Sequence, residues 1–288
     1  MSVQTFRPLL NQVLEHEKVP TLNGFREKAF DLLAKKGLPT RKDEDWKYTN
    51  IKPLVDTIYQ IPTHKQPPPE EFLKVLGNQM FSIVFLNGQF NSQLSKIPIE
   101  PGIEVHSVKD RPELLTANKF AVETDAFDLL NASLFQDGVY LALKDHTHVK
   151  PTIYIDHIFT KHAQPTMVAA KSIVHLGKNS SCQIVERFVH LSESQIFTNS
   201  VSQIELEEHA NLTLLKDCYG KHEYCHVGHT IVSIAKQASC ESVMLHQGGR
   251  LGRHNLSIIL RGEEARARAL GLYLLKAQQH SDFRVCID

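Results

Sequence analysis

From about residue 170 onward, short runs of apolar and β-branched residues alternate with polar turns at a nearly fixed interval. The first run of each unit closes on an apolar residue, and these residues lie 30, 28 and 26 positions apart: Leu176, Leu206, Ile234 and Leu260. Each is followed by a polar turn (GKNSS, EEHAN, AKQAS or RGEEA), and a second run then begins at Cys182, Leu212, Cys240 or Ala267. A period of this length predicts a mainly β fold, a solenoid whose repeats bury their apolar faces by stacking on one another.

The repeat leaves two points open. A β-sandwich or jelly roll with regularly spaced strands would give a similar pattern, but four turns in phase favour the solenoid. The register within a run is not fixed, because Val201 and Ile204 would lie on opposite faces of one strand. Helix propensity is high in RGEEARARAL (261–270), yet the repeat phase puts a turn there. We therefore expect no helix between residues 150 and 288.

The N-terminal part shows helical periodicity instead. Apolar residues at helical spacing predict helices over about 4–17, 23–36 and 125–135, with Gly37 as the left-handed residue that ends the second. Alternating or β-branched runs predict strands over 81–90, 102–108, 139–143 and 152–159, and Asn87-Gly88 predicts a hairpin turn. The prolines of THKQPPPEEF (63–72) predict a stiff linker. We expect three segments: a helical region over 1–65, a mixed α/β lead-in over 66–150, and a β-solenoid core over 151–288.

Composition narrows the function classes. Thirty-two acidic and 32 basic residues balance, which leaves no basic stripe for nucleic acid. No apolar run is long enough to cross a membrane, and the first residues lack the pattern of a secretory signal. Five cysteines, an odd number, are typical of reduced thiols rather than a disulfide framework. These features predict a cytoplasmic protein that binds neither nucleic acid nor a membrane.

One segment has the composition of a metal site. Within DCYGKHEYCHVGHT, the spacing of Cys218, His222, Cys225 and His229 allows two pairs of sulfur and nitrogen ligands, as zinc requires. No C-x₂-C pair occurs, however, and strand alternation would scatter these side chains. Small buried thiols and peripheral histidines are therefore the alternative interpretation. No nucleotide-binding loop and no serine-hydrolase elbow occurs in the sequence, so we assign no catalytic residue and expect no enzyme activity.

Several separated motifs resemble one protein family. The segment GLPTRKDEDWKYTNI is similar to the N-terminal signature of the SufB/SufD family of iron–sulfur cluster assembly scaffold proteins. The resemblance continues through FDLLNASLFQDG and through two segments of the repeat, in the same order along the chain. Within the family, the N-terminal helices and the Trp-Lys-Tyr loop are more similar to the SufD branch. The residues that carry the resemblance are Pro39, Arg41, Glu44, Trp46, Lys47, Tyr48, Thr49, Leu130, Asn131, Asp137, Gly138, Gly249, Arg253, Gly262, Gln279, His280 and Asp282.

The resemblance implies a right-handed parallel β-helix between helical terminal regions, and a subunit that binds partners rather than catalyses a reaction. The implied partners are a SufB-like subunit, bound through the β-helix, and a SufC-like ATPase. Family members continue well beyond Asp282, so we expect a chain truncated at its C-terminus that has lost the ATPase contact. No cofactor is implied for the chain itself, since an iron–sulfur cluster or iron would be held only transiently in the complex. Two alternatives stay open: a metal-dependent β-solenoid enzyme using the Cys218–His229 cluster, and an inert truncated fragment.

Overall fold

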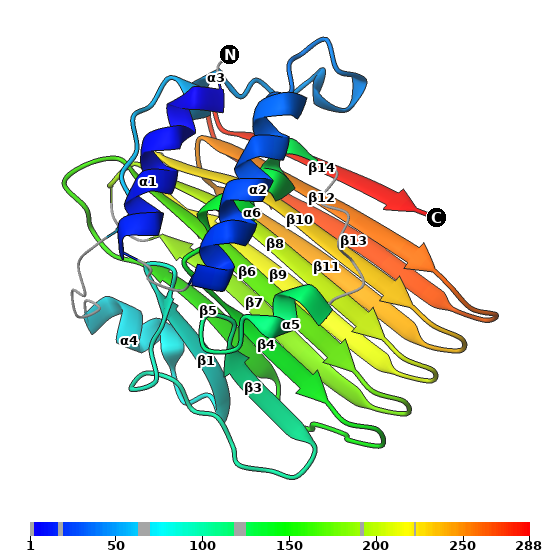
Figure 1. Ribbon diagram of the computed structural model, residues 1–288. Coiled ribbons are helices and arrows are strands. Elements are labelled where there is room, and N and C mark those ends of the chain that lie inside the picture. The colour runs from blue at the N-terminus through cyan, green and yellow to red at the C-terminus, as the bar shows by residue number, and fades with distance from the viewer. Residues whose placement is uncertain (1–2, 17–19, 63–69, 118–124, 191–192, 222) are drawn as a thin grey trace.

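The repeat region folds into a solenoid built from two parallel sheets. The computed structural model describes residues 3–16, 20–62, 70–117, 125–190, 193–221 and 223–288. Strands from successive repeats alternate between sheet A (order β14-β12-β10-β8-β6-β4-β3) and sheet B (order β13-β11-β9-β7-β5-β1-β2), so the chain winds around a common interior (Figure 1). The solenoid strands are β5 (Ile153–Phe159), β6 (Thr166–Leu176), β7 (Ser181–His190), β8 (Ile196–Leu206), β9 (Asn211–Gly220), β10 (Tyr224–Ile234), β11 (Ser239–Gly248), β12 (Leu251–Leu260), β13 (Arg266–Leu274) and β14 (His280–Ile287). The predicted β-solenoid is confirmed.

The polar turns keep the repeats in register. Each turn places one residue in the left-handed region, at Asn179, His209, Gln237 and Glu264. In the first three of these turns a backbone N–H donates to a carbonyl of the next turn: from Asn179 to Glu208 at 2.9 Å, from His209 to Lys236 at 3.1 Å and from Gln237 to Glu263 at 2.9 Å. The residue after each turn pairs in parallel with its counterpart one repeat on. Stacked turns therefore fix the period that the sequence shows, and no helix occurs among the described residues of 150–288.

The solenoid interior, which we call the lumen, has two apolar ends and a polar middle. One end is filled by the inward side chains next to the turns, including Leu176, Leu206, Ile234 and Ile258. The opposite end holds a second cluster of Phe159, Val168, Ala170, Phe188, Ile196, Cys218, Tyr224 and Met244. Between them, buried serine, threonine, histidine, lysine and glutamate side chains face inward. A polar middle of this kind is expensive unless its groups bind one another.

N-terminal helices cover the outer face of sheet A. The helices α1 (Arg7–His16), α2 (Pro20–Lys36) and α6 (Ala126–Leu134) lie across it in Figure 1. Phe30 and Leu33 of α2 share one apolar cluster with Phe197 of β8, and Gly37 ends α2 at φ +79 as predicted. Helix α2 begins at Pro20, three residues before the predicted start, because proline suits the first turn of a helix. A short helix, η1 (Val3–Phe6), precedes α1, and the loop that carries the only tryptophan lies between α2 and α3 (Lys52–Val55).

The segment before the repeats joins both sheets. Strands β1 (Phe81–Leu86) and β2 (Gln89–Phe90) form the predicted hairpin, with Asn87 and Gly88 both at positive φ, and β1 then pairs in parallel with β5. Strands β3 (Ile103–Ser107) and β4 (Asp137–Leu143) continue sheet A, because β4 pairs in parallel with β6. The sheets thus run across residue 150, while the three predicted segment boundaries stay a prediction. The proline linker lies largely in 63–69, outside the described residues, and the sequence did not predict α4 (Glu70–Leu76) or α5 (Glu113–Ala117).

Asn131 and Gly138 explain why α6 and β4 fit closely against the neighbouring strands. Asn131 donates through Nδ2 to the backbone carbonyls of Ala170 and Asn199, at 2.9 Å each, which ties α6 to β6 and β8. A Cβ on Gly138 would lie 2.4 Å from the Lys171 carbonyl oxygen, so β4 can approach β6 only with glycine there.

Among the described helices, none has the length and apolar character needed to cross a membrane.

Candidate functional site

The tryptophan loop is held against the end of sheet A by a buried arginine. The loop contains η2 (Glu44–Trp46), and the Trp46 ring stacks on Phe127 of α6 with ring centroids 5.0 Å apart. The Arg253 guanidinium lies 3.9 Å over the same ring, and its Nη1 donates to the carboxylate of Asp282 on β14. Thr49 also donates to Asp282, and all of these groups except Asp282 are at least 95% buried. The structure therefore joins four residues of the sequence signature, from three distant segments, into one cluster.

The remaining signature residues lie apart from this cluster. Arg41 donates from Nε to the Lys47 carbonyl at 3.2 Å, which closes the loop on itself, while Tyr48 is 76% exposed. Gly262 lies in a turn where a Cβ would come within 2.3 Å of the Lys236 backbone nitrogen. Other signature residues make only local contacts or face solvent: Pro39 and Glu44 line the loop's cleft, Gly249 adopts φ +75, Gln279 accepts from the Lys276 backbone, and His280 begins β14.

The structure does not bring the predicted metal ligands together. Cys218 on β9 lies in the lumen, whereas Cys225 on β10 faces outward beneath the N-terminal helices. His229 binds other partners, and His222 lies outside the described residues. Burial raises the pKa of the Cys225 thiol to about 12 and that of the Cys218 thiol well above its usual range. The two strands belong to different sheets, which is why close sequence spacing did not become proximity.

A cleft of about 600 Å³ lies beside the tryptophan loop. Its wall includes Trp46 and the outward side chains of β10 and β12, among them His229, Asn255 and Ser257. His229 Nδ1 lies 2.8 and 3.0 Å from the carboxylate oxygens of Asp128, and its Nε2 lies 2.9 Å from the Ser257 hydroxyl. Of the three bonded residues Asp128, His229 and Ser257, the sequence had singled out only His229. Ser257 was findable in principle, since it lies two positions after Asn255, which follows His229 by the 26-residue period of these two strands and pairs with it.

A buried ion pair occupies the polar middle of the lumen. Lys216 on β9 lies directly opposite Glu186 on β7, and its Nζ is 2.7 Å from Glu186 Oε2. The carboxylate also accepts from the Ser172 and Ser202 hydroxyls, at 2.7 and 3.2 Å, and contacts His157 Nε2 at 3.2 Å. Burial raises the pKa of Glu186, but Lys216 and His157 outweigh it and hold that pKa well below its usual range. In the sequence, the only sign of this ion pair is that Glu186 and Lys216 carry opposite charges and lie one repeat period apart.

Histidine rings continue the polar row toward the last repeats. His226 and His254 stack with ring centroids 6.1 Å apart, and each bonds a threonine hydroxyl within 2.9 Å. Gly228 makes room for them, because a Cβ there would lie 2.4 Å from His254 Nδ1 and 2.7 Å from His226 Nε2. Burial lowers the pKa of both rings well below the usual value, and lowers the pKa of His246 to about 4. These rings are therefore neutral at physiological pH.

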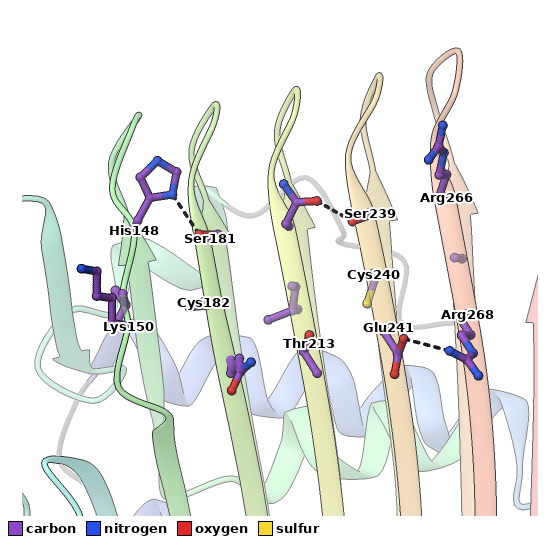
Figure 2. Close-up of a pocket in the computed structure, with 15 residues that line it drawn as sticks. His148, Lys150, Ser181, Cys182, Thr213, Ser239, Cys240, Glu241, Arg266 and Arg268 are labelled. Carbon is purple, nitrogen blue, oxygen red and sulfur yellow. Dashed lines mark hydrogen bonds and ion pairs between the residues drawn. The ribbon is translucent and has the colours of Figure 1, made fainter.

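The outer face of sheet B carries a shallow groove of about 670 Å³ near the turns. Figure 2 shows its ladder of side chains crossing successive strands, with His148 and Lys150 at one end and Arg266 and Arg268 at the other. His148 contacts the Ser181 hydroxyl at 2.8 Å, and Glu241 accepts from Arg268 at 3.4 Å. The Cys182 and Cys240 thiols point into the lumen, where burial raises both pKa values to about 12. The groove is thus a polar surface with basic ends.

One group of side chains has the composition of a cation site. His175, Glu205 and Glu207 offer ligand atoms that all lie within 4.8 Å of one another, and no other such group occurs among the residues the structure describes. His175 Nδ1 and Glu205 Oε2 are 3.4 Å apart, with side chains 34% and 25% exposed. The group is an open, solvated arrangement on the outer face of sheet A.

Comparison with known proteins matches nearly the whole chain to one protein family. A family model described as the SufBD protein N-terminal region matches residues 5–155, and a second, for the SufBD core domain of SUF system FeS cluster assembly, matches 158–288. The chain is 26% identical over 258 residues to the iron-sulfur cluster assembly protein SufD of Escherichia coli, covering 89% of this chain and 60% of that protein. It is also 26% identical over 276 residues to the SufBD family protein slr0076 of Synechocystis, with the same coverage. The chain therefore spans about 60% of the length of these relatives.

Proposed function

Because the chain belongs to the SufBD family, we propose that it acts as a SufD-like scaffold or accessory subunit in SUF iron–sulfur cluster assembly. The observation that carries the proposal is the joining of Trp46, Thr49, Arg253 and Asp282. These residues were selected from the sequence as family signature, and they form one buried cluster. The cluster seats the N-terminal loop on the solenoid and so stabilises a rigid binding surface. In this proposal the iron–sulfur cluster is cargo of the assembled complex, and the chain itself holds no resident cofactor.

The proposal assigns a SufB-like subunit to the solenoid as its partner. Apolar side chains in support of this lie on the outer face of sheet B, where Val185, Leu215, Val243 and Leu270 follow one another in cross-strand register. Leu270 and Leu272 on β13 are 43% and 55% exposed. Rows of exposed apolar side chains on a rigid sheet are typical of protein–protein contact surfaces. The five free cysteines are consistent with a reducing compartment, so the proposal places the protein in the cytoplasm.

Co-expression with candidate partners tests the proposal. The tagged chain would be produced with the SufB-like and SufC-like proteins of the same organism, and the purified material would be analysed by intact-mass spectrometry. We expect the SufB-like subunit to co-purify in stoichiometric amount. Leu272→Glu should reduce its recovery, whereas Ile99→Glu should not, because Ile99 is equally apolar and fully exposed but lies outside the solenoid strands. Recovery of the folded chain without the SufB-like subunit would reject the proposal.

A further inference from the structure

Three side chains from separate elements form a linear hydrogen-bonded series at the wall of the cleft beside the tryptophan loop. Asp128 comes from the first turn of α6, His229 from β10 and Ser257 from β12. Because the Asp128 carboxylate can only accept, His229 Nδ1 must carry the proton that it donates across 2.8 Å. In the neutral ring, Nε2 then has a free lone pair, and the Ser257 hydroxyl donates to it across 2.9 Å. This is the tautomer and the order in which a histidine serves as a general base toward a serine.

Burial and access differ along the series in the way such chemistry requires. The Asp128 side chain is 2% exposed, the His229 side chain is 13% exposed, and Ser257 is half-buried at the cleft wall. Another histidine–serine contact in the molecule lacks this arrangement, since His246 contacts the Ser281 hydroxyl while its Nε2 has no partner. His229, unlike His246, therefore has a carboxylate at one ring nitrogen and a serine that faces the cleft at the other.

The residue beside Ser257 supplies a polar group without a partner. Asn255 lies two positions before Ser257 on the same face of β12, directly opposite His229 on β10. Its side chain lines the same cleft, is 92% buried, and has no hydrogen-bond partner for Oδ1. Oδ1 itself only accepts, so the group of this side chain that would donate to a developing negative charge on a substrate oxygen is the amide Nδ2.

We propose that Ser257, His229 and Asp128 form an acyl-transfer site that hydrolyses small carboxylic esters. The Ser257 Oγ bonds to the ester carbonyl carbon while its proton passes to His229 Nε2, and Asp128 stabilises the resulting imidazolium. The carbon–oxygen bond to the alcohol then breaks, and the alcohol leaves with the proton from His229. Water attacks the acyl-serine and gives a proton to His229, and His229 returns that proton to Ser257 Oγ as the bond between Oγ and the acyl carbon breaks, which releases the carboxylic acid and the free serine. Each step balances with water as the only co-reactant.

The cleft indicates which esters fit. Its volume of about 600 Å³ suits a small molecule, and Leu38, Pro39 and Trp46 give it apolar surface for an acyl chain. Carboxylates outnumber cations among its charged groups: Asp43, Glu44, Asp45 and Asp125 line it together with Lys36 and with Arg284, which is paired with Asp45 at 3.0 Å. Negative surroundings repel anions, so neutral or cationic esters are the expected substrates.

A fluorophosphonate probe tests the nucleophile on the unmodified protein. We expect one probe molecule per chain, located on Ser257 by peptide mapping, and loss of labelling in Ser257→Ala. Ser233→Ala is the matched control, because Ser233 lies on the outer face of β10 but outside the cleft lining, and it should label like the wild type. Folded wild-type protein that takes up no probe, or a Ser257→Ala variant that is labelled equally, would overturn the proposal.

Ester hydrolysis tests the other two residues and the substrate class. With 4-nitrophenyl acetate, Asp128→Asn should lower kcat/KM at least about a hundredfold, because the amide favours the wrong imidazole tautomer. Thermal unfolding of this variant would show that the fold is kept. The neutral acetate should react at least about tenfold faster than the anionic 4-nitrophenyl succinate monoester. An unchanged rate in Asp128→Asn rejects the triad, and preference for the anionic ester rejects the substrate class.

Discussion

Replacing Lys216 by methionine isolates the buried ion pair in the lumen. The Lys216 and Glu186 side chains are 2% and 3% exposed, and their charged atoms are 2.7 Å apart. Methionine keeps most of the volume of the lysine stem but leaves the Glu186 carboxylate with only neutral donors and His157. Removing one partner of a buried pair leaves an uncompensated charge, so we expect a loss of about 3–5 kcal/mol in the free energy of unfolding.

Urea unfolding followed by circular dichroism measures this loss, and an exposed pair provides the control. Lys178 and Glu208 are also ion-paired one repeat period apart, at 3.0 Å, but their side chains are 51% and 47% exposed. Lys178→Met should therefore leave the free energy of unfolding almost unchanged. Adding Glu186→Gln to Lys216→Met should recover part of the loss, because the double variant has no buried charge at the pair. A cost below about 1 kcal/mol for Lys216→Met alone would refute the reasoning.

Three further changes test other parts of the account. Burial lowers the pKa of His246 to about 4, so between pH 7 and pH 5 this histidine takes up a proton only in the unfolded chain. The free energy of unfolding should therefore fall by about 2 kcal/mol per such histidine when the pH is lowered from 7 to 5. A urea midpoint that does not change with pH would contradict this. Gly228→Ala should destabilise by about 1–3 kcal/mol, because its Cβ would meet His254 Nδ1 at 2.4 Å, and calorimetry would show the lowered Tm. Arg253→Lys should cost about 1–3 kcal/mol and shift the Trp46 fluorescence, because an ammonium cannot stack on the indole as a guanidinium does.

Two controls apply to these variants. Gly24→Ala in α2 meets no atom within 4 Å, so it should be neutral or stabilising and distinguishes a steric clash from a general effect of glycine replacement. For Arg253→Lys, Arg266→Lys changes an exposed arginine on β13 and should leave both Tm and fluorescence as in the wild type. If Gly228→Ala is as stable as Gly24→Ala, the His226 and His254 rings can move away from the added Cβ, and the predicted clash is wrong.

Local signals in the sequence predicted most of the architecture. The four turns recur because stacked turns hydrogen-bond to one another, so their period was visible without any knowledge of the sheets. Asn87-Gly88 and Gly37 adopt the positive φ angles that their residue types favour, which is why the hairpin and the end of α2 were predicted. Predicted and observed element boundaries differ where one residue type fits two positions. Pro20 can end one helix or begin the next, and in the structure it begins α2.

The candidate sites were harder to predict because they depend on which sheet and which face a residue occupies. Cys218 and Cys225 are seven positions apart, yet the chain passes from sheet B to sheet A between them, and their thiols face different cores. Glu186 and Lys216 look like solvated charges until register places them opposite each other in the lumen. The Asp128–His229 contact joins residues 101 positions apart through the docking of α6, which no periodicity encodes.

Direct binding of the purified proteins tests the central claim, that this SufD-like chain acts by binding a SufB-like subunit. Sedimentation velocity of the chain, titrated with the purified SufB-like protein of the same organism, measures complex formation without other cellular components. The account predicts a discrete complex with the wild type and with Ile99→Glu, and a weakened one with Leu272→Glu. If the folded wild-type chain sediments unchanged at every partner concentration, the claim is wrong.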